Sequence, residues 1–173
     1  MFETDYVYKT VIGGDSGVGK TALILRYITN TFLDDSKSTI GVQFATKALK
    51  INHSQIVLQL WDFAGQNIFR FLLDDYCRGA RGYILAFDLN KLDSFNHLDE
   101  WLKLFKDNMD SDAVGVLIGT KADLEKRVSQ EQIDDFAIKN ELAYLETSSK
   151  TGDNVNEAFH YLAERMVSKS NKK

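Results

Sequence analysis

The sequence predicts an α/β fold in which a doubly wound, mostly parallel, six-stranded sheet carries one antiparallel edge strand. Three observations favour this fold. Strand-like segments alternate with helix-length segments along the 173 residues, two strand-like segments are joined by a short polar turn, and a glycine-rich loop links the first strand to the first helix. Such alternation is typical of a parallel sheet with helices on both faces, and about five helices are expected.

The segments on either side of the glycine-rich loop form the first strand and the first helix. Tyr6–Ile12 is rich in β-branched and aromatic residues, as strands are. Thr21–Thr29 contains several apolar residues and no glycine or proline that would interrupt a helix. A strand is therefore expected before the loop and a helix after it.

The loop itself, Gly14–Thr21, reads Gly-Asp-Ser-Gly-Val-Gly-Lys-Thr and fits the pattern of glycine, four residues, glycine, lysine, then serine or threonine. Its glycines allow consecutive backbone amides to turn toward phosphate oxygens at the positive end of the helix dipole. Lys20 can then reach the β- and γ-phosphates, and the Thr21 hydroxyl can ligate Mg²⁺. The pattern predicts a phosphate-binding loop and, with it, a P-loop NTPase fold.

A hairpin is expected in the next part of the chain. Asn30–Gly41 is polar and lacks periodicity, so a mobile surface loop is predicted there. Val42–Ile51 and Ile56–Trp61 read as two strands, and the short turn Asn52-His53-Ser54 makes them an antiparallel pair. Ile68–Cys77 is expected to form an irregular helix.

Single strands alternate with helices beyond the hairpin. Ser129 with Gln132 has the spacing of a capping box and predicts the start of a helix. The strands are expected at Tyr83–Phe87, Val114–Ile118 and Leu142–Leu145. The helices have apolar faces at helical spacing, formed by Phe95, Leu98, Trp101, Leu102 and Phe105, by Ile133, Phe136 and Ala137, and by Val155, Phe159, Leu162, Ala163 and Met166.

Composition limits the class of protein. A net charge of -4 argues against a general nucleic-acid binder, so no nucleic-acid partner is expected. Cys77 is the only cysteine, which excludes an intramolecular disulfide, and the three histidines lack partners at metal spacing, so surface or packing roles are expected for them. The start of the chain is acidic, unlike a secretory signal, and no apolar run approaches membrane-spanning length. We expect a cytoplasmic monomer with one domain, residues 1–168, and a short basic tail, residues 169–173.

Polar residues that can carry chemistry come just after the predicted strands. Asp62 ends the third strand, where a carboxylate can hold Mg²⁺ directly or through water. Gly65 can offer its amide to a γ-phosphate because it has no side chain, and Gln66 can orient an attacking water. In an open α/β sheet, ligands bind outside the carboxyl ends of the strands. These residues are therefore expected to face the phosphate-binding loop.

Two further polar segments follow the fifth and sixth strands. Asp123, in Thr120-Lys121-Ala122-Asp123, can accept two hydrogen bonds from the N1 and 2-amino groups of guanine, which adenine cannot match. The run Thr147-Ser148-Ser149-Lys150 supplies backbone amides where the guanine O6 would lie. Guanine is therefore the expected base.

These motifs together resemble the Ras superfamily of small GTPases, and within it the Rab-like branch, over nearly the whole chain. The resemblance implies that Gln66 is catalytic, that Phe32 packs on the guanine ring and that Thr39 senses the γ-phosphate. The metal ligands that it implies for the cofactor Mg²⁺ are Thr21, Thr39 and Asp62. The GTP-binding residues that it implies are Asp15, Ser16, Gly17, Val18, Gly19, Lys20, Thr21, Ala22, Phe32, Thr39, Gly65, Thr120, Lys121, Asp123, Ser148, Ser149 and Lys150.

The chain departs from the family pattern at several positions. Phe63 stands where the family usually has threonine, and Asn67 where it usually has glutamate, on either side of Gln66. Thr120 replaces the commoner asparagine. The tail has no cysteine, so C-terminal prenylation is not possible on this chain. Either a longer C-terminus has been trimmed, or the protein works without a lipid anchor, which leaves membrane association open.

The predicted function is a GTP-binding molecular switch that slowly hydrolyses GTP to GDP and phosphate. Loss of the γ-phosphate is expected to release the segments 34–42 and 65–75, so that effectors dissociate. Effectors, exchange factors and GTPase-activating proteins are the expected partners, in vesicle trafficking or signalling. Two alternatives remain at this point: a nucleotide-gated binding scaffold with negligible hydrolysis, and a P-loop ATPase or small-molecule kinase.

Overall fold

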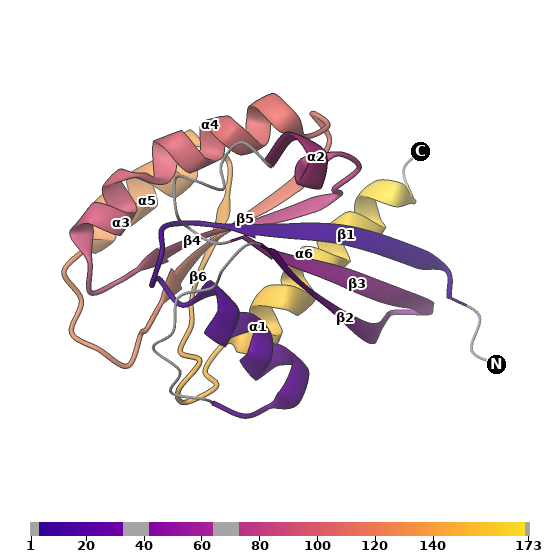
Figure 1. Cartoon of the computed structure of the whole chain (residues 1–173), viewed down its shortest axis with the longest axis horizontal. Coiled ribbons are helices and arrows are strands. Elements are labelled where there is room, and N and C mark those ends of the chain that lie inside the picture. The colour runs from indigo at the N-terminus through magenta and orange to yellow at the C-terminus, as the bar shows by residue number, and fades with distance from the viewer. Residues whose placement is uncertain (1–3, 33–41, 64–72, 172–173) are drawn as a thin grey trace.

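The computed structural model of the chain describes residues 4–32, 42–63 and 73–171. A six-stranded sheet with the order β2-β3-β1-β4-β5-β6 forms its centre (Figure 1). The strands are Tyr6–Gly13 (β1), Val42–Ile51 (β2), Ser54–Phe63 (β3), Gly82–Asp88 (β4), Val114–Thr120 (β5) and Ala143–Glu146 (β6). β2 pairs antiparallel with β3, and the other four pairings are parallel. The predicted fold class is confirmed.

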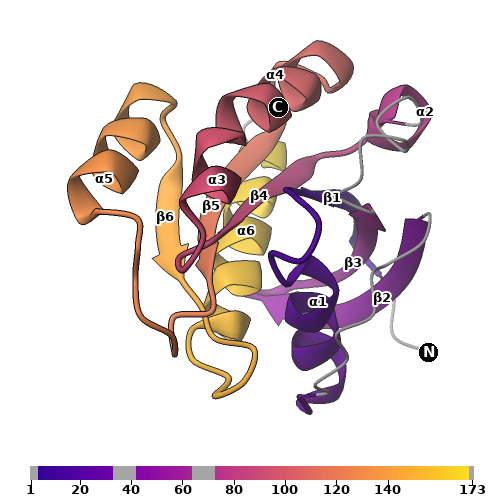
Figure 2. The ribbon, with the colours of Figure 1, turned by 60° about the vertical axis from the view of Figure 1, so that its left-hand side comes forward.

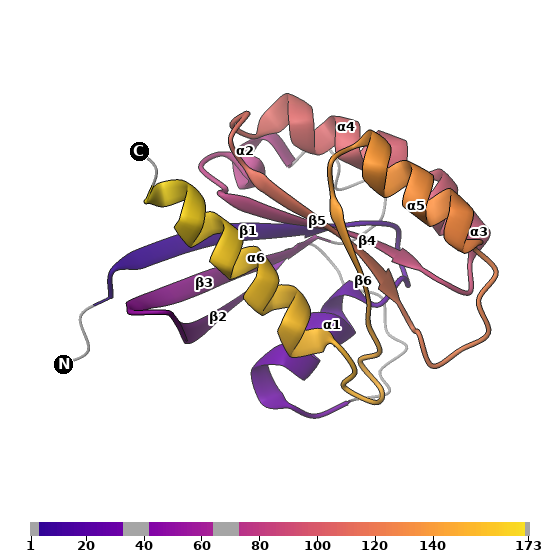
Figure 3. The ribbon, with the colours of Figure 1, turned by 180° about the vertical axis from the view of Figure 1, so that it is seen from behind.

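Helices cover both faces of this sheet. They are Lys20–Thr29 (α1), Leu73–Cys77 (α2), Leu92–Asn96 (α3), Leu98–Asn108 (α4), Gln130–Lys139 (α5) and Val155–Ser170 (α6). α1 and α6 pack on one face, and α3, α4 and α5 pack on the other (Figures 1 and 3). Along the described ranges, none of the helices combines the length and the apolar character needed to span a bilayer.

The central strand β4 is buried on both faces of the sheet. Ile84 and Ala86 contribute to the core under α1 and α6, whereas Leu85 and Phe87 contribute to the core under α3, α4 and α5. A continuous apolar run of this kind is typical of a parallel strand covered by helices on both sides. The sheet therefore separates two apolar cores, and its carboxyl edge is left for polar residues.

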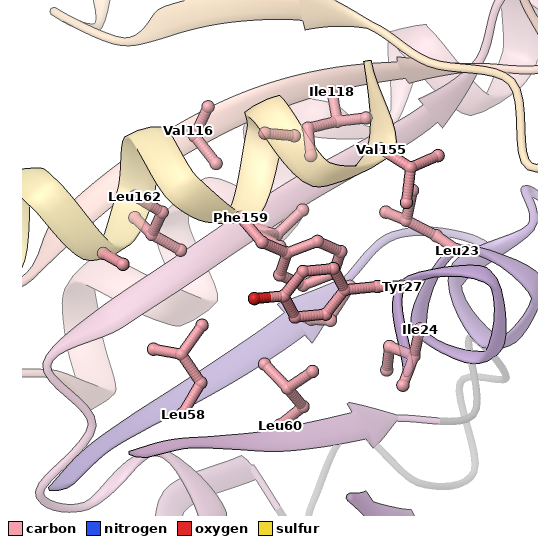
Figure 4. Close-up of a cluster of buried hydrophobic side chains, with 14 of the residues drawn as sticks. Leu23, Ile24, Tyr27, Leu58, Leu60, Val116, Ile118, Val155, Phe159 and Leu162 are labelled. Atoms are coloured by element: carbon pink, nitrogen blue, oxygen red, sulfur yellow. The ribbon is translucent and has the colours of Figure 1, made fainter. Parts of the chain in front are cut away.

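An aromatic stack joins the first helix to the last. Tyr27 of α1 lies parallel to Phe159 of α6, with ring centroids 4.0 Å apart and planes 12° from parallel (Figure 4). Such a pair contributes about 0.5–1.5 kcal/mol beyond the area that it buries. The helix that follows the phosphate-binding loop is thereby packed against α6, the last helix of the described chain.

The hairpin turn is shorter than predicted. Ile51 lies opposite Ser54 in the β2–β3 ladder, so Ser54 already belongs to β3 and only Asn52 and His53 form the turn. Asn52 takes a φ of 54°, a left-handed conformation that asparagine tolerates better than most residues.

The last strand begins one residue later than the predicted Leu142–Leu145. Glu141 takes a φ of 55°, and the N–H of Leu142 donates to the Ala137 carbonyl oxygen at 2.9 Å. This bond ends α5 in the manner of a left-handed helix cap, so Leu142 belongs to the end of the helix and the ladder starts at Ala143. β4 and β5 are each slightly longer than predicted.

The apolar face predicted between β4 and β5 is confirmed, because Phe95, Leu98, Trp101, Leu102 and Phe105 are all buried. The helix that carries it is interrupted at one residue, which ends α3 and precedes α4. That residue, His97, has φ -86° and ψ 0°, at the edge of the right-handed helical region.

Other local predictions have mixed outcomes. Ser129 and Gln132 form the predicted capping box at the start of α5, with the Gln132 N–H donating to the Ser129 hydroxyl at 3.3 Å. Of the irregular helix expected at 68–77, only 73–77 is described, and it is helical. Most of the loop expected at 30–41 lies outside the described residues.

Candidate nucleotide-binding site

The glycine-rich loop between β1 and α1 has a backbone that only glycine accommodates at its first position. Gly14 has a φ of +144°, and a Cβ atom placed there would lie 2.1 Å from the carbonyl oxygen of Ala86. Gly19, the N-cap of α1, has a φ of 99° and no capping side chain. The N-terminus of a helix favours a bound anion, because its backbone amides and the helix dipole both point toward it. The loop therefore has the backbone of a phosphate-binding site.

Lys20 is held inside this loop. Its side chain is 5% exposed, and its ammonium donates to the carbonyl oxygens of Gly14 and Asp15, each at 2.8 Å. Burial lowers the pKa of Lys20 to about 8, although the nearby carboxylates of Asp62 and Asp15 act in the opposite direction. An ammonium has three N–H donors, so a phosphate oxygen can accept a hydrogen bond from the third.

Thr21 and Asp62 form an oxygen pair beside Lys20. The Thr21 hydroxyl donates to Oδ2 of Asp62, a buried residue at the end of β3. Burial raises the pKa of Asp62, while the hydrogen bond from Thr21 and the charge of Lys20 lower it. Oδ1 of Asp62 is buried without a hydrogen-bond partner among the described residues. A buried carboxylate oxygen beside a hydroxyl is the donor set that a hard cation such as Mg²⁺ prefers.

The described ranges contain no cluster of three acidic, histidine or cysteine side chains that would hold a metal ion alone. This arrangement fits Mg²⁺, which usually binds one or two protein oxygens and completes its shell with phosphate oxygens and water. The Thr21–Asp62 pair therefore suits a cation that arrives with a nucleotide.

Thr120 and Lys121, at the end of β5, form hydrogen bonds with the phosphate-binding loop. The Thr120 hydroxyl lies 2.5 Å from the carbonyl oxygen of Val18 and 2.9 Å from that of Phe87. The Lys121 ammonium donates to the carbonyl oxygen of Gly17 at 2.8 Å, and Lys121 takes a φ of 59°. The segment predicted to recognise the base is thereby fixed relative to the segment predicted to bind the phosphates.

Hydrogen bonds also join the loop after β5 to the loop after β6. The Ser148 hydroxyl donates to Oδ1 of Asp123 at 2.6 Å, and the N–H of Ala122 donates to the carbonyl oxygen of Thr147 at 3.0 Å. Ser148 is buried, whereas Asp123 is exposed and can be reached by a base. A positioned carboxylate at this place can select a base that offers two adjacent N–H donors.

The structure brings most of the predicted site residues to one edge of the sheet. The phosphate-binding loop, Asp62, Thr120-Lys121 and the 147–150 loop are linked by the hydrogen bonds described above. Phe32 follows α1 and is 37% exposed. Three predicted residues lie outside the described part of the chain: Thr39, Gly65 and Gln66.

Three residues at this edge were missed by the sequence analysis. Asp88, at the end of β4, accepts from the Lys121 ammonium at 2.7 Å and is almost fully buried. Asp88 lies at the end of a strand, so the rule that ligands bind outside the carboxyl ends of the strands could have identified it from the sequence. His97 and Trp101 contact the side chain of Asp15 in the phosphate-binding loop. No spacing in the sequence indicates this contact, because it depends on how the α3–α4 segment packs beside the loop.

This edge is that of a P-loop nucleotide-binding protein, and hydrogen bonds join the loops that were predicted to bind the phosphates and the base. A sequence model of the Ras family matches residues 9–168. The chain is 44% identical over 159 residues to the GTP-binding protein ypt3 of Schizosaccharomyces pombe, covering 91% of this chain and 74% of that protein. It is 41% identical over 173 residues to the Ras-related protein RABA4b of Arabidopsis thaliana (99% and 77%), and 42% identical over 171 residues to the Ras-related protein Rab11A of Lotus japonicus (98% and 76%).

The chain belongs to the Ras family and, by its similarity to these relatives, to the Rab-like branch of small GTPases. It is a GTP-binding switch that hydrolyses GTP, as members of this family are. Ras-superfamily GTPases generally use Mg²⁺, and Rab-like GTPases bind GTP, GDP, regulators and effectors. The predicted resemblance and the predicted GTPase activity are confirmed.

Proposed function

We propose that residues 1–168 form the GTP-binding domain, that residues 169–173 are a short basic tail, and that GTP and GDP bind at the carboxyl edge of the sheet. The observation that supports this most strongly is the bonding of Thr120 and Lys121 to the phosphate-binding loop, because it sets base and phosphate recognition at a fixed distance. The proposed GTP-binding residues are 15–22, Phe32, Thr39, Gly65, Thr120, Lys121, Asp123 and 148–150.

In this proposal Thr21, Asp62 and Thr39 hold Mg²⁺, which when bound neutralises phosphate charge. The unpartnered Oδ1 of Asp62 supports this assignment. Lys20 and the loop amides stabilise the negative charge that develops on the phosphate oxygens as the bond to the γ-phosphate breaks. Gln66 orients the water that attacks in line.

We propose slow intrinsic hydrolysis, on the order of 10⁻⁴ per second. The segment 34–42 contains Lys37 but no arginine, so the chain has no arginine there to stabilise the transition state. A partner that supplies an arginine would accelerate the reaction. Loss of the γ-phosphate ends the proposed contacts of Thr39 and Gly65 with it, which changes the surface presented to partners.

A partly exposed aromatic cluster supports the proposed binding of effectors and regulators. Phe44 of β2 is 54% exposed, and its ring meets Trp61 of β3 edge-on at 5.0 Å. Trp61 in turn lies 5.5 Å from the ring of Tyr76 in α2. Aromatic side chains held in place but exposed to solvent are enriched at protein interfaces. We infer that partners contact the protein at Phe44, Trp61 and Tyr76.

We place this switch in membrane trafficking, as a cytoplasmic monomer, because its relatives are Rab-type proteins.

The test is single-turnover hydrolysis of GTP, with ATP in parallel, for the wild type and Gln66→Leu. We expect GTP alone to be bound and cleaved slowly, with the variant slower by about tenfold or more because its side chain cannot hydrogen-bond to water. Gln130→Leu, an exposed position on α5, is the matched control and should behave as the wild type.

Three results would contradict the proposal. A wild-type rate of about 10⁻² per second or more would mean that an arginine acts within the chain. An unchanged rate for Gln66→Leu would mean that another group positions the water. Binding of ATP as tightly as GTP would overturn the assigned role of Asp123.

A further inference from the structure

The side chain of Asp15, in the phosphate-binding loop, is held from the other side by the α3–α4 segment. Nδ1 of His97 lies 2.5 Å from Oδ2 of Asp15, and the indole Nε1–H of Trp101 donates to Oδ1 at 2.8 Å. Both carboxylate oxygens are therefore engaged. The backbone carbonyl of the same residue accepts from the Lys20 ammonium, so Asp15 connects α4 to the cation of the loop. Figure 2 shows this loop, in indigo, beside α3.

The local structure explains why these two side chains converge. Trp101 is four residues beyond His97, one helical turn, so the two side chains project toward the same neighbour. Trp101 is 1% exposed, which fixes its indole within the core under α4. His97 occupies the break between α3 and α4, and its side chain is 48% exposed. The pair thus combines a rigid donor with one that exchanges protons with solvent.

We propose that His97 and Trp101 are positioning residues for nucleotide binding: they fix the Asp15 carboxylate and with it the phosphate-binding loop, and the charge of His97 sets how long the nucleotide is retained. The proposal rests on the proposed role of residues 14–21 in holding the phosphates.

The charges around His97 give the direction of the effect. Asp15 places a negative charge in a loop that binds an anion, and a protonated His97 neutralises it. The other charged groups that act on the ring are Glu100 of α4 and Asp93 of α3. The hydrogen bond and the charge of Asp15 raise the pKa of His97, and burial opposes them. Glu100 and Asp93 raise it by smaller amounts.

A raised pKa means that the charged pair is complete below the unfolded-state value of about 6.5 and is lost as the pH rises through the higher folded-state value. Above that pH, the uncompensated charge of Asp15 repels phosphate and the loop is held less firmly. Nucleotide release should therefore become faster as the pH rises. Solvent screens a half-exposed pair, so we expect a change of about two- to fivefold.

The first experiment measures the release of a fluorescent GDP analogue from the Mg²⁺-loaded wild type between about pH 5.5 and about pH 8.5. Lys20 stays protonated over this range when GDP is bound, because the phosphate charge raises its pKa above the value of about 8 in the free protein. We expect release to accelerate about two- to fivefold over this range, and His97→Gln, which keeps a donor but no charge, to release at the faster rate throughout. His160→Gln is the matched control, because His160 contacts Glu164 on α6 and is also half exposed. It should keep the wild-type profile.

A second variant separates positioning from charge. Trp101→Phe keeps an aromatic ring in the core but removes the donor to Oδ1 of Asp15, so it should release GDP faster at every pH and keep the wild-type slope. Thermal unfolding of the GDP-bound variant establishes that it is folded. The proposal is overturned if the release rate of Trp101→Phe no longer depends on pH, or if the release rate of His97→Gln still does.

A third measurement needs no nucleotide exchange. Titration of the His97 ring by NMR in Asp15→Asn should give a lower pKa than in the wild type, because the charge that stabilises the imidazolium is removed. An unchanged pKa would overturn the pairing. A wild type that binds no GDP would contradict the proposed function itself, whereas tight GDP binding with a flat pH profile would contradict only this inference.

Discussion

The carboxyl edge of the sheet, where we propose that the nucleotide binds (the nucleotide edge), and the β2–β3 hairpin are stabilised by different kinds of hydrogen bond. At the nucleotide edge, side chains of Thr120, Lys121 and Ser148 bond to neighbouring loops and fix them to one another. The hairpin is held by its backbone ladder, and it exposes large side chains such as Phe44 at 54%. The comparison teaches that side-chain hydrogen bonds between loops make the first region rigid, as the proposed nucleotide site requires, whereas the second leaves apolar surface that suits the proposed protein partners.

The largest expected effect tests the nucleotide edge at its most buried charge. Lys20→Ala removes the ammonium and leaves the carbonyl oxygens of Gly14 and Asp15 without it. Hydrogen bonds to charged groups contribute about 1.5–3 kcal/mol each, so GTP affinity should fall about 10²- to 10⁴-fold. Isothermal calorimetry checks this. Lys103→Ala, whose lysine is 73% exposed on α4, is the control, and a loss in Lys20→Ala below tenfold would refute the prediction.

The next effect comes from separating the two recognition loops. Thr120→Val preserves the shape of the side chain but removes the hydroxyl, so its hydrogen bond to the carbonyl oxygen of Val18 or Phe87 is lost in the interior. This costs about 1–3 kcal/mol, and GDP release measured by fluorescence should be about ten- to a hundredfold faster. Thr46→Val, at an exposed position of β2, should release GDP at the wild-type rate. Equal rates for both variants would show that the loops are coupled in another way.

A smaller effect is expected from Ser148→Ala. This change removes the hydroxyl that positions Asp123 but leaves the carboxylate in place. One hydrogen bond contributes about 0.5–1.5 kcal/mol, so GTP affinity should fall about tenfold or less, and discrimination against ATP should fall with it. Competition binding with both nucleotides measures this, with Ser168→Ala on the exposed side of α6 as control. A loss of GTP affinity in Ser148→Ala as large as that in Lys20→Ala would contradict this ranking of the expected effects.

The smallest effect should come from the hairpin. Phe44→Ala removes an exposed ring that touches Trp61, so the free energy of unfolding should fall by about 1 kcal/mol or less. GDP release should change by less than about twofold, since no nucleotide contact is lost. Urea unfolding and GDP release check the two statements. A large change in release would mean that the two regions are not independent.

Local patterns were enough to predict most of the fold. The phosphate-binding loop, the β2–β3 hairpin and the capping box at Ser129 depend on residues close together in sequence, and the structure has all three. Where β6 begins and where α3 ends depend on backbone bonds at Leu142 and His97 that no apolar period indicates.

The place of the candidate site was predictable from the glycine pattern of residues 14–21 and from the strand ends at Asp62 and Thr120, which the structure places at one edge of the sheet. The contact of His97 with Asp15 joins residues 82 positions apart, so it required the packed structure. Gln66 and Thr39 lie outside the described residues, so their roles stay predictions.

The stack of Tyr27 on Phe159 has a consequence for synthesis of the protein. The helix that follows the phosphate-binding loop is among the first elements to leave the ribosome, but its packing partner is on the last helix described. Contacts between such distant residues form late, since the intervening chain must be made and closed first. A nascent chain therefore cannot pack Tyr27 on Phe159 until α6 has been made, so this face of α1 stays uncovered during most of translation.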